Sequence, residues 1–205
     1  MLNFMCNDEM DNEAKNDLKI DKKHTALVVI DLQKGIASMP TEPYSSQSII
    51  KNAANLANAF RANNMPVFLV HVMSSDIDRL KTISDDQSMQ QFHELPKDWA
   101  DFAPELGPKD SDCIITKKQW GTFYGTDLDL QLRRRDINTI VLCGIATTYG
   151  VESTARFAYE FGYQQIFAED AITDRSKAAH DNAVNFVLKR IGRIRKTNEI
   201  LNALI

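Results

Sequence analysis

The stretch that decides the fold spans residues 139–169, TIVLCGIATTYGVESTARFAYEFGYQQIFAE. It opens with an apolar run, TIVLCGI at residues 139–145, and closes with a second one, QQIFAE at residues 164–169. Residues 154–161 between them have a helical pattern that stops at Gly162, a residue type that often ends helices. Two apolar strands joined by a helix predict a crossover connection, and hence a parallel sheet that is covered on both faces.

The same alternation of strand and helix patterns continues outward from this stretch. Short apolar or β-branched runs predict further strands at residues 25–30, 66–72, 113–116 and 193–195. Helical spacing of apolar residues predicts helices at residues 47–62, 127–135 and 176–189, and another from residue 198. This order of segments predicts an α/β protein whose parallel sheet is sandwiched between helices.

The composition limits the classes of function. A chain of 205 residues fits one domain, and its net charge of −4 offers no basic surface for nucleic acid or an anionic membrane. Three cysteines are too few for a disulfide framework, so we expect a reducing, cytoplasmic location. No apolar run approaches the roughly 18 residues that a membrane span requires. Residues 1–24 are polar and lack a signal-peptide core, which predicts an N-terminal arm before one domain at residues 25–205.

Ligands of such sheets bind outside the carboxyl ends of the strands, so these ends are the places to search for a site. After the first strand, Asp31 follows an apolar run and is followed in turn by Gln33. A carboxylate in this position is partly removed from water, which raises its pKa and suits proton transfer. A helix cap or a salt-bridge partner is the alternative interpretation of Asp31.

The third strand ends in two adjacent lysines. Lys117 and Lys118 point in opposite directions if the strand continues, so only one of them can face the crevice. Lysines at strand ends are more often solvated surface residues. The aromatic residues that follow favour a pocket wall or, equally, ordinary core packing; they are Trp120, Phe123 and Tyr124.

The fourth strand runs into a helix start at residues 146–150. Thr147 and Thr148 are candidates to cap this helix, whose free N–H groups would favour an anion. Gly150 would let a ligand or a backbone segment come close, although an isolated glycine more often occurs because tight packing leaves no space for a side chain.

Three blocks of sequence carry a resemblance to a known family. They are ALVVIDLQKG, KKQWGTFYGTDLDLQLRRRDINTIVLCGIATTYGVESTARFAYEFGY and AEDAITD. In this order and spacing they resemble the isochorismatase-like (cysteine hydrolase) family, and most closely its uncharacterised YecD-type hydrolases, which have glycine in place of the nucleophilic cysteine. The resemblance implies a three-layer αβα, Rossmann-like fold with a six-stranded parallel sheet.

The resemblance also implies the site residues. The Asp–Lys–Cys triad of the family falls on Asp31, Lys117 and Gly150, because the family lysine precedes by four residues the small residue that is here Gly121. A cis peptide is expected before Ala146. Amidases of the family need the missing thiol, and Cys143 lies within a strand without the exposed, electropositive setting of a reactive cysteine.

Family members that lack the cysteine are similar to this chain in carrying glycine there. In them the aspartate acts as a general acid on a vinyl ether, and water completes the hydrolysis. The resemblance therefore implies a small-molecule hydrolase with Asp31 as proton donor and Lys117 as its electrostatic partner. The alternative is a catalytically inactive, small-molecule-binding member of the fold.

The remaining expectations concern the pocket and the partners. His71 stands alone after the second strand, so we expect no metal site, and we expect no cofactor. The resemblance and the aromatic-rich loops predict a homo-oligomer that binds neither nucleic acid nor a membrane. The residues expected to line the substrate pocket are Gln33, His71, Trp120, Phe123, Tyr124, Ala146, Thr147 and Tyr149.

Overall fold

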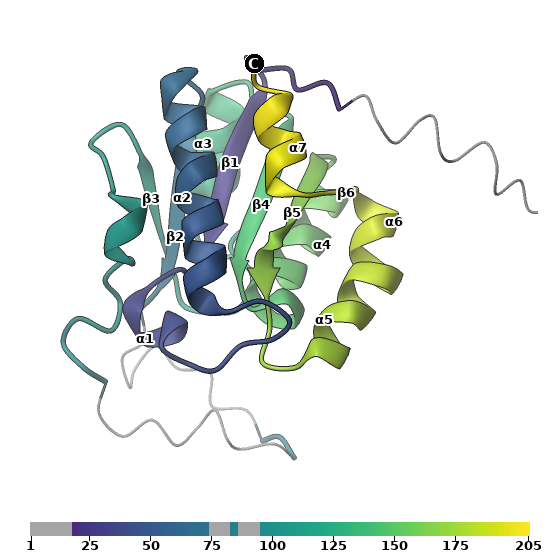
Figure 1. The fold of residues 1–205 in the computed structure, drawn as a ribbon. Coiled ribbons are helices and arrows are strands. Elements are labelled where there is room, and N and C mark those ends of the chain that lie inside the picture. The colour runs from purple at the N-terminus through teal and green to yellow at the C-terminus, as the bar shows by residue number, and fades with distance from the viewer. Residues whose placement is uncertain (1–17, 74–82, 86–94) are drawn as a thin grey trace, which may run out of the picture.

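The computed structural model describes residues 18–73, 83–85 and 95–205, which form a three-layer α/β fold (Figure 1). Its centre is a six-stranded parallel sheet with the strand order β3-β2-β1-β4-β5-β6. The predicted α/β class, the parallel sheet and the strand count are therefore confirmed. The strands are β1 (Thr25–Ile30), β2 (Val67–Val72), β3 (Cys113–Lys117), β4 (Thr139–Ile145), β5 (Gln164–Thr173) and β6 (Arg193–Arg195).

Helices cover both faces of the sheet. One face carries α2 (Ser46–Ala62) and α7 (Thr197–Asn202), and the other carries α3 (Leu128–Arg134) and α4 (Glu152–Glu160) (Figure 1). The remaining helical segments are α1 (Lys34–Ala37), η2 (Pro104–Leu106), the π-helical η3 (Thr147–Val151), α5 (Lys177–Asn182), the π-helical η4 (Ala183–Leu188) and α6 (Lys189–Ile191).

The longest helix shows why the predicted pattern forms this layer. The Ser45 hydroxyl accepts a hydrogen bond from the Ser48 N–H and caps the start of α2. The buried face of α2 follows three- and four-residue spacing, so one stripe of the helix packs on the sheet. None of the described helices is both long enough and apolar enough to cross a membrane.

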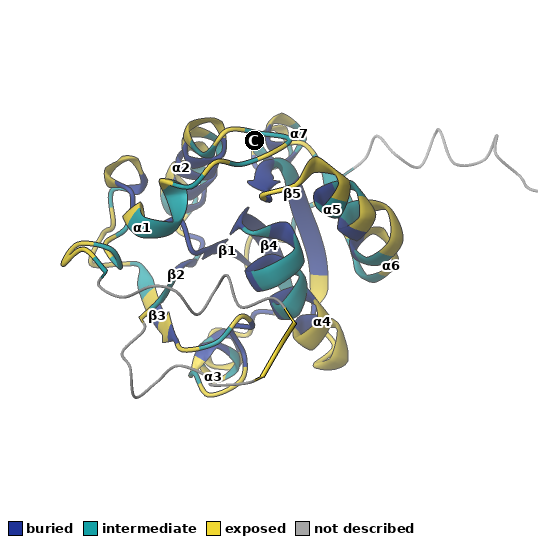
Figure 2. Ribbon diagram, turned by 90° about the horizontal axis from the view of Figure 1, so that it is seen from below, coloured by how far each residue is buried: buried dark blue, intermediate teal, exposed yellow. Residues whose placement is uncertain are grey.

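The order of the strands reverses between β1 and β4. The chain winds from β1 through β2 to β3 on one side, and from β4 through β5 to β6 on the other. The crossover helices leave in opposite directions at this point, and ligand sites of doubly wound sheets lie there. Figure 2 looks onto the carboxyl edge, where the buried strands are ringed by helices with exposed outer faces.

Part of the predicted N-terminal arm can be compared with the structure. Residues 1–17 lie outside the described residues. In the rest of the arm, Leu18 and Ile20 pack against the hydrophobic core. The segment at residues 73–112, which has no clear periodicity in the sequence, is described only in part.

Gly144 decides how closely β1 and β4 meet at the carboxyl edge. The β4–β5 register shifts between Leu142 and Gly144, and Gly144 has a φ of 128°. A Cβ at this position would lie 2.0 Å from the carbonyl oxygen of Ile30. Any side chain would therefore push apart β1 and β4 at their carboxyl ends.

We expect Gly144→Ala to lose roughly 3 kcal/mol or more of the free energy of unfolding, because the methyl group meets backbone that cannot move aside. Gly162→Ala is the matched control, since Gly162 has a φ of 81° but nothing within 4 Å of its Cβ position. It should lose only the conformational penalty of about 1–2 kcal/mol. Urea unfolding followed by circular dichroism measures both, and equal losses would contradict the packing argument.

Candidate functional site

Asp31 stands at the switch point, directly after the end of β1. Its backbone N–H donates to the carbonyl oxygen of Val70, which continues the pairing of β1 with β2 for one more residue. Its φ of 52° lies in the left-handed region, which short polar residues enter more easily than other non-glycine residues. Strain of this kind clusters at functional sites, where the surrounding structure holds it in place. The side chain is only 6% exposed.

Lys117 reaches this carboxylate from β3, across the end of β2. Its Nζ lies 2.7 Å from Oδ2 of Asp31, and the lysine side chain is 2% exposed. The same Nζ donates a hydrogen bond of 2.6 Å to the carbonyl oxygen of Trp120. Lys118 is exposed, so the two lysines point in opposite directions and it is Lys117 that lies against Asp31.

The two carboxylate oxygens of Asp31 have different surroundings. Oδ2 is held by Lys117, whereas Oδ1 is buried with no hydrogen-bond partner in the part of the chain that the structure describes. Burial raises the pKa of the Asp31 carboxyl above its ordinary value, and the charge and hydrogen bond of Lys117 only partly oppose this. The carboxyl group therefore gains a proton more readily than an exposed aspartate does, and Oδ1 is the oxygen free to carry it.

Gly150 completes the group of three residues. A Cβ at Gly150 would lie 3.1 Å from Oδ2 of Asp31, 3.3 Å from Nζ of Lys117 and 2.9 Å from the Cγ2 methyl of Ile30. The position therefore faces the ion pair, and any side chain here would crowd Ile30, Asp31 and Lys117. The structure brings Asp31, Lys117 and Gly150 together at the carboxyl edge, which is the arrangement that the sequence predicts.

Cys143 offers no replacement for the missing thiol. It is fully buried in β4, and burial raises the pKa of its thiol far above the ordinary value. The group therefore stays protonated, and a protonated thiol is a poor nucleophile.

The polar side-chain atoms of two predicted pocket residues form hydrogen bonds within the chain. The Gln33 amide accepts from the Val72 N–H and donates to carbonyl oxygens of Val72 and Trp99. His71 Nδ1 lies 2.9 Å from the carbonyl oxygen of Ala100, so Nδ1 carries the proton and Nε2 accepts from the Thr116 hydroxyl. Both side chains therefore brace the wall beside the ion pair and have no ring or amide nitrogen free to bind a substrate.

The aromatic residues divide into two groups. Trp120 and Tyr149 form an edge-to-face pair with ring centroids 4.8 Å apart, beside the Lys117 and Gly150 positions. Phe123 is buried and packs against Phe161 and Tyr163, at the far end of α4. The structure does not bring Phe123 to the ion pair, because its ring completes the core under α4, and Tyr124 is 73% exposed.

The expectation that Thr147 and Thr148 cap the following helix is wrong. The Thr147 hydroxyl lies 2.8 Å from His180 Nδ1, and the N–H and hydroxyl of Thr148 both donate to Asp174 Oδ2. The Ala146 carbonyl oxygen instead accepts from the N–H groups of Tyr149 and Val151, so the chain enters α4 through a π-helical turn. The peptide bond between Ile145 and Ala146 is cis.

Asp174 and His180 are site-supporting residues that sequence reasoning missed. Asp174 is 2% exposed and follows the apolar end of β5, which is the same pattern that singled out Asp31. That pattern was therefore available in the sequence. His180 lies within α5 among polar residues, where nothing in the sequence distinguishes it. Within the described ranges, no three His, Cys, Asp or Glu side chains are grouped so as to hold a metal ion.

Comparisons with known proteins point to one family. Residues 25–199 match the family described as Isochorismatase domain. The chain is 50% identical over 187 residues to the uncharacterized isochorismatase family protein YwoC of Bacillus subtilis (strain 168), covering 91% of this chain and 97% of that protein. It is also 50% identical over 189 residues to the uncharacterized isochorismatase family protein YecD of Escherichia coli O157:H7, covering 91% and 100%.

A solved structure supports the same conclusion about the fold. The isochorismatase family protein from Burkholderia thailandensis superposes with a TM-score of 0.85 at 41% sequence identity. The match covers 91% of this chain and 97% of that one. The six-stranded α/β fold that the resemblance implies is thereby confirmed.

The buried ion pair predicts a specific pattern of stability. We expect Asp31→Asn to lose about 3 kcal/mol of the free energy of unfolding, because it leaves the Lys117 ammonium group buried without its counter-charge. The double variant Asp31→Asn/Lys117→Met should lose less than the single one, since both charges are gone. A urea-unfolding double-mutant cycle measures the coupling, and additive losses would show that the two groups do not interact.

Proposed function

The chain belongs to the isochorismatase family, and from this premise we propose that it hydrolyses a small molecule by proton transfer from Asp31, without a protein thiol. The observation that carries the proposal is the unequal environment of the two Asp31 oxygens. Lys117 holds Oδ2, while Oδ1 is buried and without a partner among the described residues. A carboxyl group arranged in this way can be kept oriented through one oxygen and deliver a proton from the other.

The raised pKa of Asp31 supports the same role. A general acid must hold its proton before the reaction, and a neighbouring lysine works against this by favouring the carboxylate. Here burial of Asp31 is the larger effect and raises the pKa of the carboxyl. Lys117 also shares its ammonium group with the carbonyl oxygen of Trp120, which divides its attraction between two acceptors.

The proposed reaction is hydrolysis of a vinyl ether. Asp31 gives its proton to the terminal carbon of the double bond, and the electron pair of that bond forms the new C–H bond. The resulting oxocarbenium ion lies beside the carboxylate that has just formed, which stabilises its positive charge. Water then adds to the cationic carbon, the hemiketal releases the alcohol and a carbonyl product, and the proton returns to Asp31.

Gly150 fits this reaction because it leaves room where a side chain would crowd the ion pair. A Cβ there would lie 2.9–3.3 Å from Ile30, Asp31 and Lys117, which is closer than ordinary van der Waals contact. In the proposed reaction the position carries no thiol, and water is the nucleophile.

A second candidate is a small-molecule-binding protein that has the fold without the catalysis. The glycine at the nucleophile position favours it, because family chemistry that needs a thiol has no thiol here. The buried Asp31–Lys117 pair argues for the enzyme, since placing two charges away from water has a free-energy cost that binding alone does not require.

We expect Asp31→Asn to lower turnover by about 10²- to 10⁴-fold in a screen of vinyl ethers, esters and amides, because asparagine has no proton to deliver.

For the wild type, kcat/KM should fall as the pH rises through the raised pKa of Asp31, since only the protonated form is the acid. Alkylation of the cysteines should leave activity intact. The measurement is a pH–rate profile with the best substrate of the screen.

Asp110→Asn is the matched control, because Asp110 is an exposed carboxylate in a loop. Unchanged turnover in Asp31→Asn would end the acid-catalysis proposal. Binding of a screened compound without any turnover would favour the binding protein.

We also propose that the protein forms a homo-oligomer through the face around α3 and α4. Large apolar side chains are exposed together there, and contiguous patches of this kind mark protein interfaces. The residues are Trp120, Tyr124, Leu130, Phe157 and Phe161, which are 54%, 73%, 53%, 40% and 45% exposed.

Sedimentation at micromolar concentration should show a species of at least twice the chain mass of 23.2 kDa. Phe157→Ser should shift the protein toward the single chain, because it removes one of these exposed apolar side chains. A wild-type protein that sediments only as a 23.2 kDa species would refute the proposal.

A further inference from the structure

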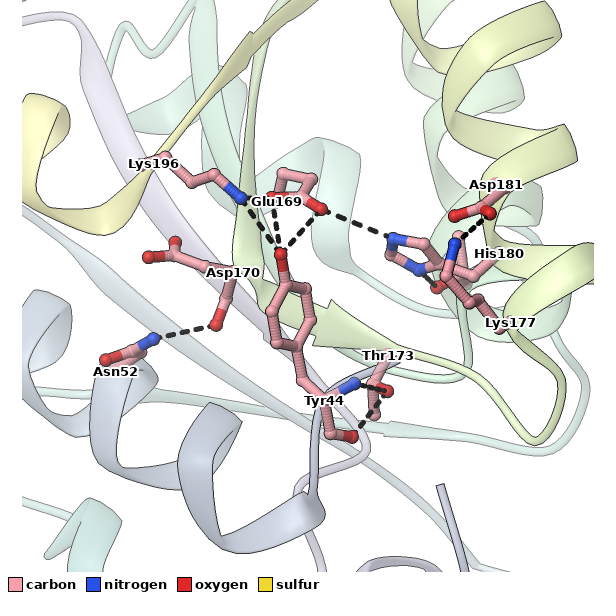
Figure 3. Close-up of polar contacts among 10 residues, drawn as sticks. Tyr44, Asn52, Glu169, Asp170, Thr173, Lys177, His180, Asp181 and Lys196 are labelled. Atoms are coloured by element: carbon pink, nitrogen blue, oxygen red, sulfur yellow. Dashed lines mark hydrogen bonds and ion pairs between the residues drawn. The ribbon is translucent and has the colours of Figure 1, made fainter. Parts of the chain in front are cut away.

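A cavity of about 350 Å³ lies apart from the Asp31–Lys117 pair, where β5, β6, α5, η4 and α7 meet. None of the residues that line it belongs to the pair or to the turn that carries Gly150. Its size is in the range that holds a small metabolite. Figure 3 shows several of its residues, with Glu169 and Lys196 facing each other on one side and His180 and Asp181 on the other.

Two of the three acidic side chains that line this cavity, Glu169 and Asp181, are paired with lysines. Glu169 forms an ion pair with Lys196 and accepts hydrogen bonds from the Tyr44 hydroxyl, and Asp181 pairs with Lys177 (Figure 3). Burial raises the pKa of Glu169, but its contacts with His180, Lys196 and Tyr44 outweigh this and lower it to about 2. The carboxylate is therefore ionised, and its charge is balanced by Lys196.

Two buried nitrogens at this cavity make only long contacts with carboxylates and no hydrogen bond within the part of the chain that the structure describes. His180 is 1% exposed, and its Nδ1 contacts the Thr147 hydroxyl, but Nε2 makes no hydrogen bond. Nε2 lies 3.6 Å from Oε1 of Glu169, which is too long for one. The buried Nε of Arg195 also has no hydrogen bond, and its nearest carboxylate oxygen, on Glu199, is 4.0 Å away.

Unpaired buried nitrogens of this kind are rare in folded proteins because losing their water has a free-energy cost. Glu199 is the ion-pair partner of Arg195, but its Oε1 lies 4.0 Å from Nε and makes no hydrogen bond with it, while its Oε2 accepts from the Lys196 N–H. After the internal ion pairs are counted, the guanidinium group of Arg195 is the charged group at the cavity with the weakest partner. A planar guanidinium group binds carboxylate and phosphate oxygens especially well.

We propose that this cavity is a second small-molecule site, which takes an oxyanion on Arg195 and His180. The oxyanion is a carboxylate or a phosphate, because both present oxygens that accept from the guanidinium group and from a ring N–H. Val184 and Ile194 form an apolar part of the wall, where a short hydrocarbon portion of the ligand would lie. The side chain of Arg195 is 15% exposed, so small side-chain shifts suffice for contact.

His180 connects this site to the turn that carries Gly150. When Nε2 donates to a bound oxyanion, a neutral ring must accept at Nδ1, so the Thr147 hydroxyl becomes the donor. Thr147 is the first residue of η3, and Gly150 lies in the same turn. An occupant of the cavity would thus fix the hydrogen bond that anchors the start of this turn.

The test is calorimetric titration of the full-length protein with inorganic phosphate and with benzoate, in a buffer that contains neither. We expect at least one of the two anions to bind with one equivalent per chain, and the comparison distinguishes phosphate from carboxylate recognition. Benzamide, the neutral analogue of benzoate, should not bind. Arg195→Gln should weaken binding by about tenfold or more, because it removes the charged guanidinium group that donates hydrogen bonds to the oxyanion.

Arg193→Gln is the matched control, since Arg193 belongs to the same strand but is exposed and does not line the cavity. It should bind as the wild type does, and so should Lys117→Met, which changes the other site. Val184→Phe keeps every charge but fills the cavity, and it should abolish binding even if Arg195→Gln does not fold.

Three results would overturn the proposal. They are no binding of either anion at millimolar concentration, wild-type affinity in folded Arg195→Gln or Val184→Phe, and loss of binding in Lys117→Met that circular dichroism shows to be folded. None of these measurements depends on turnover, so a failure of the proposed hydrolase function leaves the test intact.

Discussion

Lys117 reaches across the end of β2 to Asp31 and so joins two strands that are not neighbours in the sheet. Both side chains are almost fully buried, so each charge has lost its water and depends on the other. This dependence constrains everything around the pair. The backbone at Asp31 must adopt a positive φ to aim the carboxylate, and the position that faces the pair must be small, as Gly150 is.

The carboxyl edge is held open for this pair by backbone packing. Gly144 lets β4 approach the carbonyl oxygen of Ile30, and the Gln33 side-chain amide ties the chain after β1 to the backbone of Val72 at the end of β2. Neither residue needs to touch a ligand to matter. They set where the strand ends lie, and the strand ends carry Asp31 and Lys117.

The turn after β4 is anchored from β5 and α5. Asp174 binds the N–H and hydroxyl of Thr148, and His180 binds the hydroxyl of Thr147, so the threonines face away from the helix start. His180 also stands at the cavity formed with Glu169, Arg195 and Lys196. The turn that carries Gly150 is therefore held by Asp174 and His180, and His180 also lines the cavity.

The sequence by itself determined the fold and the central residues of the site. Apolar strand runs and helical spacing are local patterns that can be recognised in the sequence. They are strong here because the strands of a parallel sheet are buried on both faces and must be apolar throughout. The two-residue period of a strand meant that only one of Lys117 and Lys118 could face the site, and the family resemblance pointed to Lys117. Only the tertiary structure decided what the polar side chains bind. Thr147, Gln33 and His71 find partners far away in the chain, and Phe123 packs under α4 although its neighbours in sequence lie at the site. A hydroxyl, amide or imidazole accepts many partners, so the choice depends on which groups folding brings within about 3 Å, and no local pattern records that distance.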